Sequence, residues 1–186
     1  LITLTAQDEI GGNPVAGTVT DTAGSIELFA GSSVDVSSTT AGSIVLAGAG
    51  ALTLTDVDTA DGAITATAAG LLTATNVVAG GATGDSVTLS TTTGGSVATL
   101  VTGADAVSIT ASAGDVTLGA VEATAGTLGV TATTGSINDA DDDAVTDLTA
   151  GGLITLTAQA EIGGAAASMS TDTAGSIELF AGSSVD

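Results

Sequence analysis

The chain has 186 residues and a formal net charge of −21 at pH 7, because it contains 21 acidic residues and no lysine, arginine or histidine. A chain without cationic side chains cannot neutralise the phosphates of DNA or RNA or anionic lipid headgroups, so nucleic-acid and membrane-surface binding are excluded. It also lacks cysteine. Nucleophilic triads need histidine or lysine as a base, and metal hydrolases usually need histidine or cysteine as ligands, so we expect a protein that is not an enzyme.

The first predicted element, residues 2–6, alternates apolar and small polar side chains, which indicates a strand buried on one face. The same alternating sequence motif, which we call the strand phrase, returns about every 20 residues, as is typical of a solenoid. We expect its leading apolar residues to form one continuous inward column. They are Ile2, Ile26, Ile44, Ile64, Val87, Val107, Leu128, Ile154 and Ile177.

A second apolar position follows each of these residues after 8 to 10 positions. It is occupied by Ile10, Val34, Leu52, Leu72, Val97, Val116, Ile137, Ile162 and Val185. A third side, which absorbs the differences in coil length, is marked by Val57, Val77 and Val121. Two aligned strands per coil and a variable third side predict an all-β fold, a single-stranded parallel β-helix of about 20 residues per coil. No apolar stretch reaches 18 residues, so direct insertion into a membrane is not expected.

A longer repeat contains the coil repeat. Residues 1–12 return as 153–164 with one difference, and residues 21–35 return unchanged as 172–186. Such near-identity suggests recent duplication within a tandem array.

The repeats define the expected domain organisation. We predict one continuous β-solenoid over residues 1–186, with a seven-coil unit at 1–152 and the start of the next unit at 153–186. Glycines that precede the strand phrases suit tight corners. The ends of such a stack are open sheet edges, which favours self-association end to end.

The densest acidic segment, residues 138–143, is a candidate Ca²⁺ site, because hard cations prefer several carboxylate oxygens. Its spacing is that of the start of a calcium loop, but the glycine and glutamate that such a loop needs further on are missing, so a solvated acidic loop is the alternative. Segment 56–62 is a weaker candidate, and segment 80–85 only loosely resembles a calcium-binding nonapeptide. We expect no cofactor other than Ca²⁺ at the first segment. Its candidate ligands are Asp139, Asp141, Asp142 and Asp143.

Two features concern the outward side of the strands. Thr-x-Thr pairs such as Thr65 and Thr67 invite comparison with ice-binding solenoids, but glutamate and phenylalanine occupy the same column in other coils, so ordinary strand-forming threonine is the preferred interpretation. Phe29 and Phe180, the only aromatic residues, occupy equivalent outward positions. We predict that they form an interface for lateral association, unless a neighbouring loop covers each ring.

The recurrent Ala-Gly-Ser-Ile, Thr-Gly-Ser-Ile-Asn-Asp-Ala-Asp at 134–141 and Leu-Thr-Ala-Gly-Gly-Leu-Ile-Thr-Leu-Thr-Ala at 148–158 resemble the coils of filamentous-haemagglutinin-like giant surface proteins. The resemblance implies secretion to the cell surface, a right-handed β-helix shaft and a role in adhesion or matrix. The chain differs from that family in its lack of basic residues and in its near-identical long repeat. Both differences favour a shaft over a receptor-binding tip.

The sequence thus predicts a structural, non-catalytic segment of an extracellular fibre or stalk. Its expected partners are other copies of itself, end to end or laterally, together with cations or surface glycans. The alternatives are a Ca²⁺-dependent adhesive module and an ice-binding solenoid. A contiguous outward row of ligand-type residues would favour a binding module, whereas a varied outer face favours a shaft.

Overall fold

The computed structural model describes residues 2–6, 26–28, 32–81, 85–102, 105–140, 146–163 and 169–185. Every regular element within these ranges is a β-strand, and none of the described residues belongs to a helix long and apolar enough to cross a membrane. The strands form two sheets in which neighbouring strands run parallel. The chain alternates between the sheets as it advances, so each coil stacks on the one before. The predicted parallel β-helix is confirmed.

Sheet B is the regular side of the solenoid. From β4 onward its strands are five residues long, and each pairs with the next without a register shift. These strands start 20 to 26 residues apart, close to the expected spacing. In spatial order the strands are β2 (Ile26–Leu28), β4 (Ile44–Gly48), β6 (Ile64–Ala68), β9 (Val87–Thr91), β11 (Val107–Ala111), β13 (Leu128–Ala132), β16 (Ile154–Ala158) and β18 (Ile177–Ala181).

Sheet A forms the rest of each coil. Its strands are β1 (Ile2–Ala6), β3 (Ser32–Ala41), β5 (Leu52–Asp61), β7 (Leu72–Ala74), β8 (Val77–Ala79), β10 (Gly95–Thr102), β12 (Val116–Ala123), β14 (Ile137–Asp139), β15 (Leu148–Ala150) and β17 (Thr171–Thr173). The short strands β7 and β8 both pair with the long strand β5 and with β10, so sheet A supplies two sides of the coil. The predicted third side is confirmed, because Val57 pairs with Val77, and Leu100 pairs with both Val77 and Val121.

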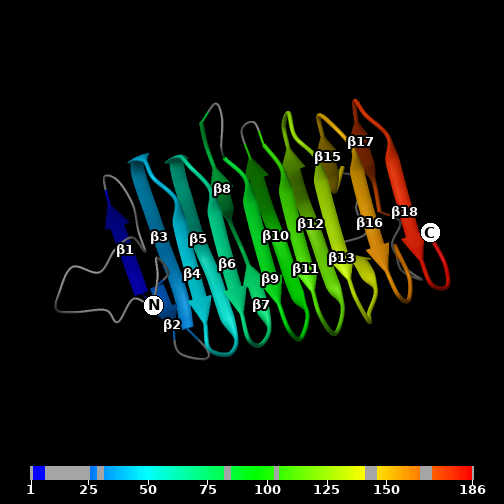
Figure 1. The fold of residues 1–186 in the computed structure, drawn as a ribbon, viewed down its shortest axis with the longest axis horizontal. Helices are drawn as coiled ribbons and strands as arrows, with labels where there is room; N and C mark the ends of the chain where they lie inside the picture. The colour runs from blue at the N-terminus through cyan, green and yellow to red at the C-terminus, as the bar shows by residue number, and fades with distance from the viewer. Residues whose placement is uncertain are drawn as a thin grey trace.

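The winding has one hand throughout Figure 1. Strands of sheet B run downward in front, strands of sheet A run upward behind them, and the chain advances from the blue end on the left to the red end on the right. This combination is a right-handed coil, the hand that parallel crossover connections almost always adopt. The solenoid therefore has the expected handedness.

The inward column predicted from the repeat is confirmed over most of sheet B. Its members from β4 to β16 are buried in a core of Ile, Leu, Val and Ala. Branched and small side chains suit this narrow interior, where each layer packs against the layers on either side. The residues that align as partners from strand to strand are Ile44, Ile64, Val87, Val107, Leu128, Ile154 and Ile177.

Two members of that predicted column are wrong. Ile2 pairs with Val34 in sheet A, and Ile26 pairs with Leu46 rather than with Ile44. Ile2 is misplaced because an alternating strand with one apolar face fits either sheet, so the phrase does not select its own position. Ile26 lies in sheet B as expected, but its pairing is displaced by two residues, which a period-two alternation cannot distinguish.

The second predicted column is correct in most coils and displaced in two. Val34 pairs with Leu54, and Val97 pairs with Leu118, so each lies two residues beyond its predicted position, while Ile10 lies outside the described residues. A shift of two residues keeps a side chain on the same face of the sheet, so the alternation was read correctly and the alignment was not. The correctly aligned residues are Leu52, Leu72, Val116, Ile137, Ile162 and Val185.

The corners bring successive coils into close backbone contact. A Cβ atom on Gly126 would lie 2.2 Å from the carbonyl oxygen of Asp105, so no larger residue fits without a shift of the chain. Gly114 has a φ of +77°, a conformation that glycine adopts without strain. The backbone N–H of Gly42 donates to the carbonyl of Asp61 in the next coil at 2.7 Å. Corner positions are therefore more constrained than the outward strand positions.

Candidate functional site

The predicted calcium loop is only partly described. Asp139 ends β14 and is half-buried, whereas Asp141, Asp142 and Asp143 lie outside the described residues. Beyond the loop, the buried Asp147 accepts a hydrogen bond from the backbone N–H of Ser170 in the next coil, at 2.6 Å. The Asp147 carboxylate therefore links two coils. The calcium loop itself stays a prediction.

The predicted aromatic interface is also half described. Phe180 pairs with Thr157, which lies in an outward column of sheet B, and its side chain is 55% exposed. Phe29 lies outside the described residues. The interface role of the two rings stays a prediction.

The outer face of sheet B carries two regular rows of hydroxyl side chains. From β6 to β16, the first row is Thr65, Thr88, Ser108, Gly129 and Thr155, and the second is Thr67, Ser90, Thr110, Thr131 and Thr157. Gly129 is the single interruption across these five strands. The sequence interpretation placed the breaks correctly at the neighbouring coils, where Val45 and Ala47 precede the rows and Glu178 and Phe180 follow them. The sequence interpretation did not predict that the two hydroxyl rows continue over five strands with Gly129 as their single interruption.

Charge is distributed unequally between the two sheets. No acidic residue occurs in the sheet B strands from β4 to β16. On sheet A, Asp56 pairs with Asp35 of the neighbouring coil and accepts a hydrogen bond from Asn76 Nδ2 at 2.8 Å. Asp58 accepts one from Ser37 Oγ at 2.9 Å. From β4 to β16, the outer face of sheet B is thus an uncharged surface on a strongly acidic protein.

Three carboxylates, which we call the acid corner, meet where sheet A turns into sheet B. They belong to Asp61, Asp85 and Asp105, in three successive coils. Asp85 Oδ1 accepts a hydrogen bond from the backbone N–H of Gly62 at 3.0 Å, and the backbone N–H of Asp85 donates to Asp105 Oδ2 at 3.1 Å. The Asp85 side chain is fully buried, and its Oδ2 atom has no hydrogen-bond partner.

Gly81 shows how closely two of these carboxylates approach each other. It has a φ of +124°, and a Cβ atom on it would lie 2.7 Å from Asp61 Oδ1, 2.8 Å from Asp85 Oδ1 and 2.9 Å from Asp85 Oδ2. Burial raises the pKa of Asp85 above its ordinary 3.8, and the Gly62 hydrogen bond opposes this rise. The negative charge of Asp61, a side-chain hydrogen bond between Asp61 and the protonated Asp85, and the negative charge of Asp105 add to it. Among the described residues, no three acidic side chains form a ready-made metal-ligand set.

Sequence analysis identified two segments of this region as weak calcium candidates but did not predict that they are in contact. Asp61 is the last carboxylate of segment 56–62 and Asp85 the last of segment 80–85, and each segment was considered separately as a weak calcium candidate. The structure brings these two carboxylates together, because successive coils stack. No periodicity of the apolar residues could have shown this contact, since Asp61 lies three residues before β6 and Asp85 lies two residues before β9.

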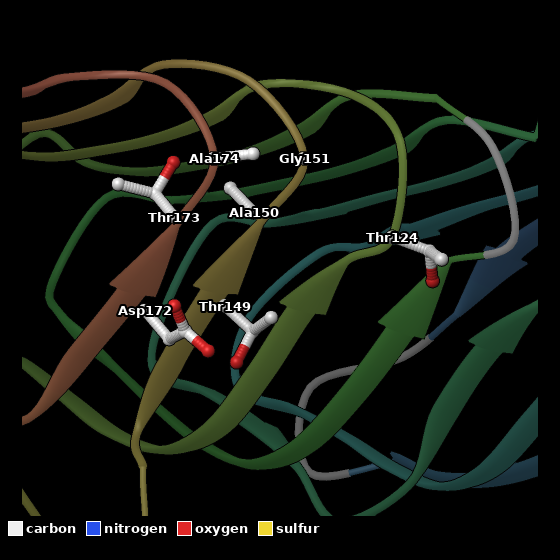
Figure 2. Close-up of a pocket in the computed structure, with 7 residues that line it drawn as sticks. All are labelled: Thr124, Thr149, Ala150, Gly151, Asp172, Thr173 and Ala174. Atoms are coloured by element: carbon white, nitrogen blue, oxygen red, sulfur yellow. The ribbon is translucent and has the colours of Figure 1, made fainter.

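An open groove of about 310 Å³ lies near the C-terminal end of the solenoid. Figure 2 shows Thr149 and Asp172 side by side on neighbouring strands β15 and β17, while Thr124 lies apart at the end of β12. The groove is lined by hydroxyl and methyl groups and by the single carboxylate of Asp172. This lining offers no acid–base pair for catalysis.

The fold defines the chain as a β-solenoid repeat protein. Comparison with protein-family models, with curated proteins and with solved structures finds no match of any of the three kinds.

Proposed function

We propose that the chain is a structural, non-catalytic segment of an extracellular fibre or stalk, which associates end to end by stacking one solenoid on another. The observation that carries this proposal is how completely one coil buries the apolar side chains of the coil before it. The side chains of Ile177, Leu179 and Val185 are 40%, 41% and 46% exposed. Their partners one coil earlier, Ile154, Leu156 and Ile162, are 0%, 1% and 2% exposed. Each added coil therefore buries the apolar surface of the coil before it and pairs its sheet edges, which is how a stack of coils extends into a fibre.

The sequence of the last coil supports stacking by a coil of the same kind. Residues 172–186 repeat residues 21–35. Within the first copy, the strand β2 pairs with the following strand β4. An identical Ile-Glu-Leu segment in β18 therefore has a known way of accepting a further strand. The extracellular location rests on the resemblance to surface fibre proteins, and the lack of histidine, lysine and cysteine supports a non-catalytic role.

Filament formation by the 186-residue chain tests the proposal. Because a charge of −21 opposes association at low salt, the chain is examined by electron microscopy and analytical ultracentrifugation in 0.05 M and 0.5 M NaCl. We expect longer assemblies at the higher salt concentration, and we expect the Ile177→Asp/Leu179→Asp double variant to abolish them. Thr157→Asp is the matched control, because it adds charge to an outward position of the preceding coil and leaves the end intact. A monomer under all conditions would contradict end-to-end stacking.

Phe180→Ser separates the two modes of self-association. Phe180 faces outward rather than along the axis, so its loss should weaken lateral contacts between filaments and leave filament length unchanged. Unchanged bundling in this variant would remove the aromatic ring from the proposed interface.

Ice binding is a second candidate function, favoured by the two hydroxyl rows on sheet B. Parallel strands about 4.8 Å apart, with outward positions about 6.6 Å apart along each strand, place these groups on a regular flat lattice. The absence of charge on this face is compatible with contact to an ordered water layer. Thermal hysteresis and inhibition of ice recrystallisation test the idea. Thr110→Glu on this face should abolish both activities, whereas Thr53→Glu on the outer side of β5 should not; absence of activity in the unmodified chain would rule the function out.

A further inference from the structure

The buried carboxylate of Asp85 needs a positive partner that the chain cannot supply. A buried charge is stable only when it is paired or coordinated. The chain has no lysine, arginine or histidine, so the compensating charge must come from solution, as a proton or as a metal cation. Among the described residues, the N–H of Gly62 donates to Oδ1, and Oδ2 has no hydrogen-bond partner.

The surroundings of Oδ2 suit a cation. Asp61 Oδ1 and both oxygens of Asp85 lie within 2.9 Å of the position that a Cβ atom on Gly81 would occupy, so the two carboxylates lie close together, and their oxygens can only accept when they are ionised. Asp61 is exposed, so an ion can reach the pair from solvent and keep part of its water shell. Hard divalent cations are bound in this way, through one or two carboxylates and several waters.

We infer that the Asp61–Asp85 pair at the acid corner binds a hydrated divalent cation of the Ca²⁺ or Mg²⁺ type, which bridges two successive coils. Asp61 and Asp85 supply the ligand oxygens, and water completes the coordination. The bound ion also holds the neighbouring backbone, because Asp85 accepts the hydrogen bond of Gly62 and donates one to Asp105. Three coils are thereby tied at one corner. This site does not depend on the fibre role.

Binding stabilises the fold, since the two carboxylates are 24 residues apart in the sequence and meet only when the coils stack. Calorimetric titration of the whole chain with CaCl₂ and, separately, with MgCl₂ in 0.15 M NaCl tests the inference, together with thermal melting in each salt. We expect saturable binding and a rise in melting temperature that levels off at saturation. The cation with the lower dissociation constant is the one that the site prefers.

Three single variants complete the test. Asp85→Asn should abolish the binding at this corner and the rise in melting temperature, and in the absence of metal it should melt above the unmodified chain, because its amide can donate to Asp61. Asp61→Asn should also abolish binding. Because Asp61 is exposed, this variant should still fold and can test the site even if Asp85→Asn does not fold. Asp172→Asn removes an exposed carboxylate elsewhere and should behave like the unmodified chain.

Two results would overturn the inference. An equal rise in melting temperature for all four proteins would mean that divalent ions only screen the net charge. The second result is that neither cation binds, while mild acidification stabilises the unmodified chain and not Asp85→Asn. That result would mean that the two carboxylates share a proton instead of binding a metal ion.

Discussion

Sheets B and A are built from the same coils, yet they differ in regularity. In sheet B from β4 to β18, every strand has five residues and no pairing shifts. In sheet A, strand lengths run from three to ten residues, and the pairing of β3 with β5 shifts between Val34 and Asp35 and again between Ser38 and Ala41. The differences in coil length are therefore accommodated outside the strands of sheet B.

This difference shows that a solenoid needs strict periodicity on only one side. Sheet B sets the register of the stack, and its outer face carries small uncharged residues from β4 to β16. Sheet A and the corners accept insertions and carry the acidic side chains. The strands of constant length and the segments of variable length therefore lie on different sides of each coil.

The largest expected effect concerns what both sheets share, the interior. Ile64 in sheet B and Val57 in sheet A are both fully buried, and an unpaired carboxylate in either position cannot be hydrated or neutralised by a basic residue. Ile64→Asp and Val57→Asp should each lower the free energy of unfolding by more than about 4 kcal/mol, measured by urea denaturation. Thr65→Ser, at the outward neighbour of Ile64, should cost less than about 0.5 kcal/mol. Equal effects of Ile64→Asp and Thr65→Ser would reverse the inside–outside assignment.

An insertion distinguishes the two sheets directly. One alanine added between Thr65 and Ala66 moves the rest of β6 to the opposite face, so we expect a loss of about 3 kcal/mol or more. One alanine added between Val34 and Asp35 should cost about 1 kcal/mol or less, because β3 is one residue shorter than β5 at this point and the pairing already shifts there. Similar losses in thermal unfolding would mean that sheet A is as strict as sheet B.

A pair of glycines compares a corner with a strand. Gly126→Ala should cost about 1 to 3 kcal/mol, because its Cβ would overlap the backbone of Asp105. Gly129→Ala, on the outer face of β13, places its Cβ 3.9 Å from the nearest atom and should gain about 0.5 kcal/mol through the lost flexibility of the unfolded chain. Chemical denaturation of both variants measures the difference. A destabilised Gly129→Ala would contradict the openness of that face.

The smallest expected effect is the pH dependence contributed by the acid corner without metal. The pKa of Asp85 is higher in the folded chain than in the unfolded chain, so the folded state binds more protons between the two values. This contribution to stability is complete below the unfolded pKa near 3.8 and is lost as pH rises through the raised folded pKa. Asp85→Asn should flatten that part of the stability profile, measured by urea denaturation in metal-free buffer. Asp172→Asn should leave the slope in place.

The alternation of residues predicted most of the fold, and it failed where a strand could join either sheet or could shift its pairing by two residues. The column from Ile44 to Ile177 and the third side at Val57, Val77 and Val121 were readable because inward positions must be apolar in every coil. However, β1 and β16 have the same sequence, Ile-Thr-Leu-Thr-Ala, and lie in different sheets. A strand phrase records which of its faces is buried and not which side of the coil it occupies.

The acid corner could not be predicted because its chemistry arises between coils. Nothing local to Asp85 distinguishes it from Asp105, which also lies two residues before a strand of sheet B. Its burial and its unpaired oxygen depend on how closely Gly81 and Asp61 approach it in the stack. The useful signal in the sequence was the absence of any basic residue. Without one, a buried carboxylate can be neutralised only by a proton or a metal cation from solution.

The direction of the strand pairing also determines how the solenoid responds to force. All strands run across the axis, so the hydrogen bonds between coils point along it, and a pull on the two ends loads them in tension one layer at a time rather than together in shear. Extension should therefore proceed by successive detachment of single coils from an end. Each coil of 20 to 26 residues would release about 70 to 90 Å of extended chain. Stretching a single molecule should give a series of small, nearly equal steps, and tension would lengthen the shaft without first breaking it.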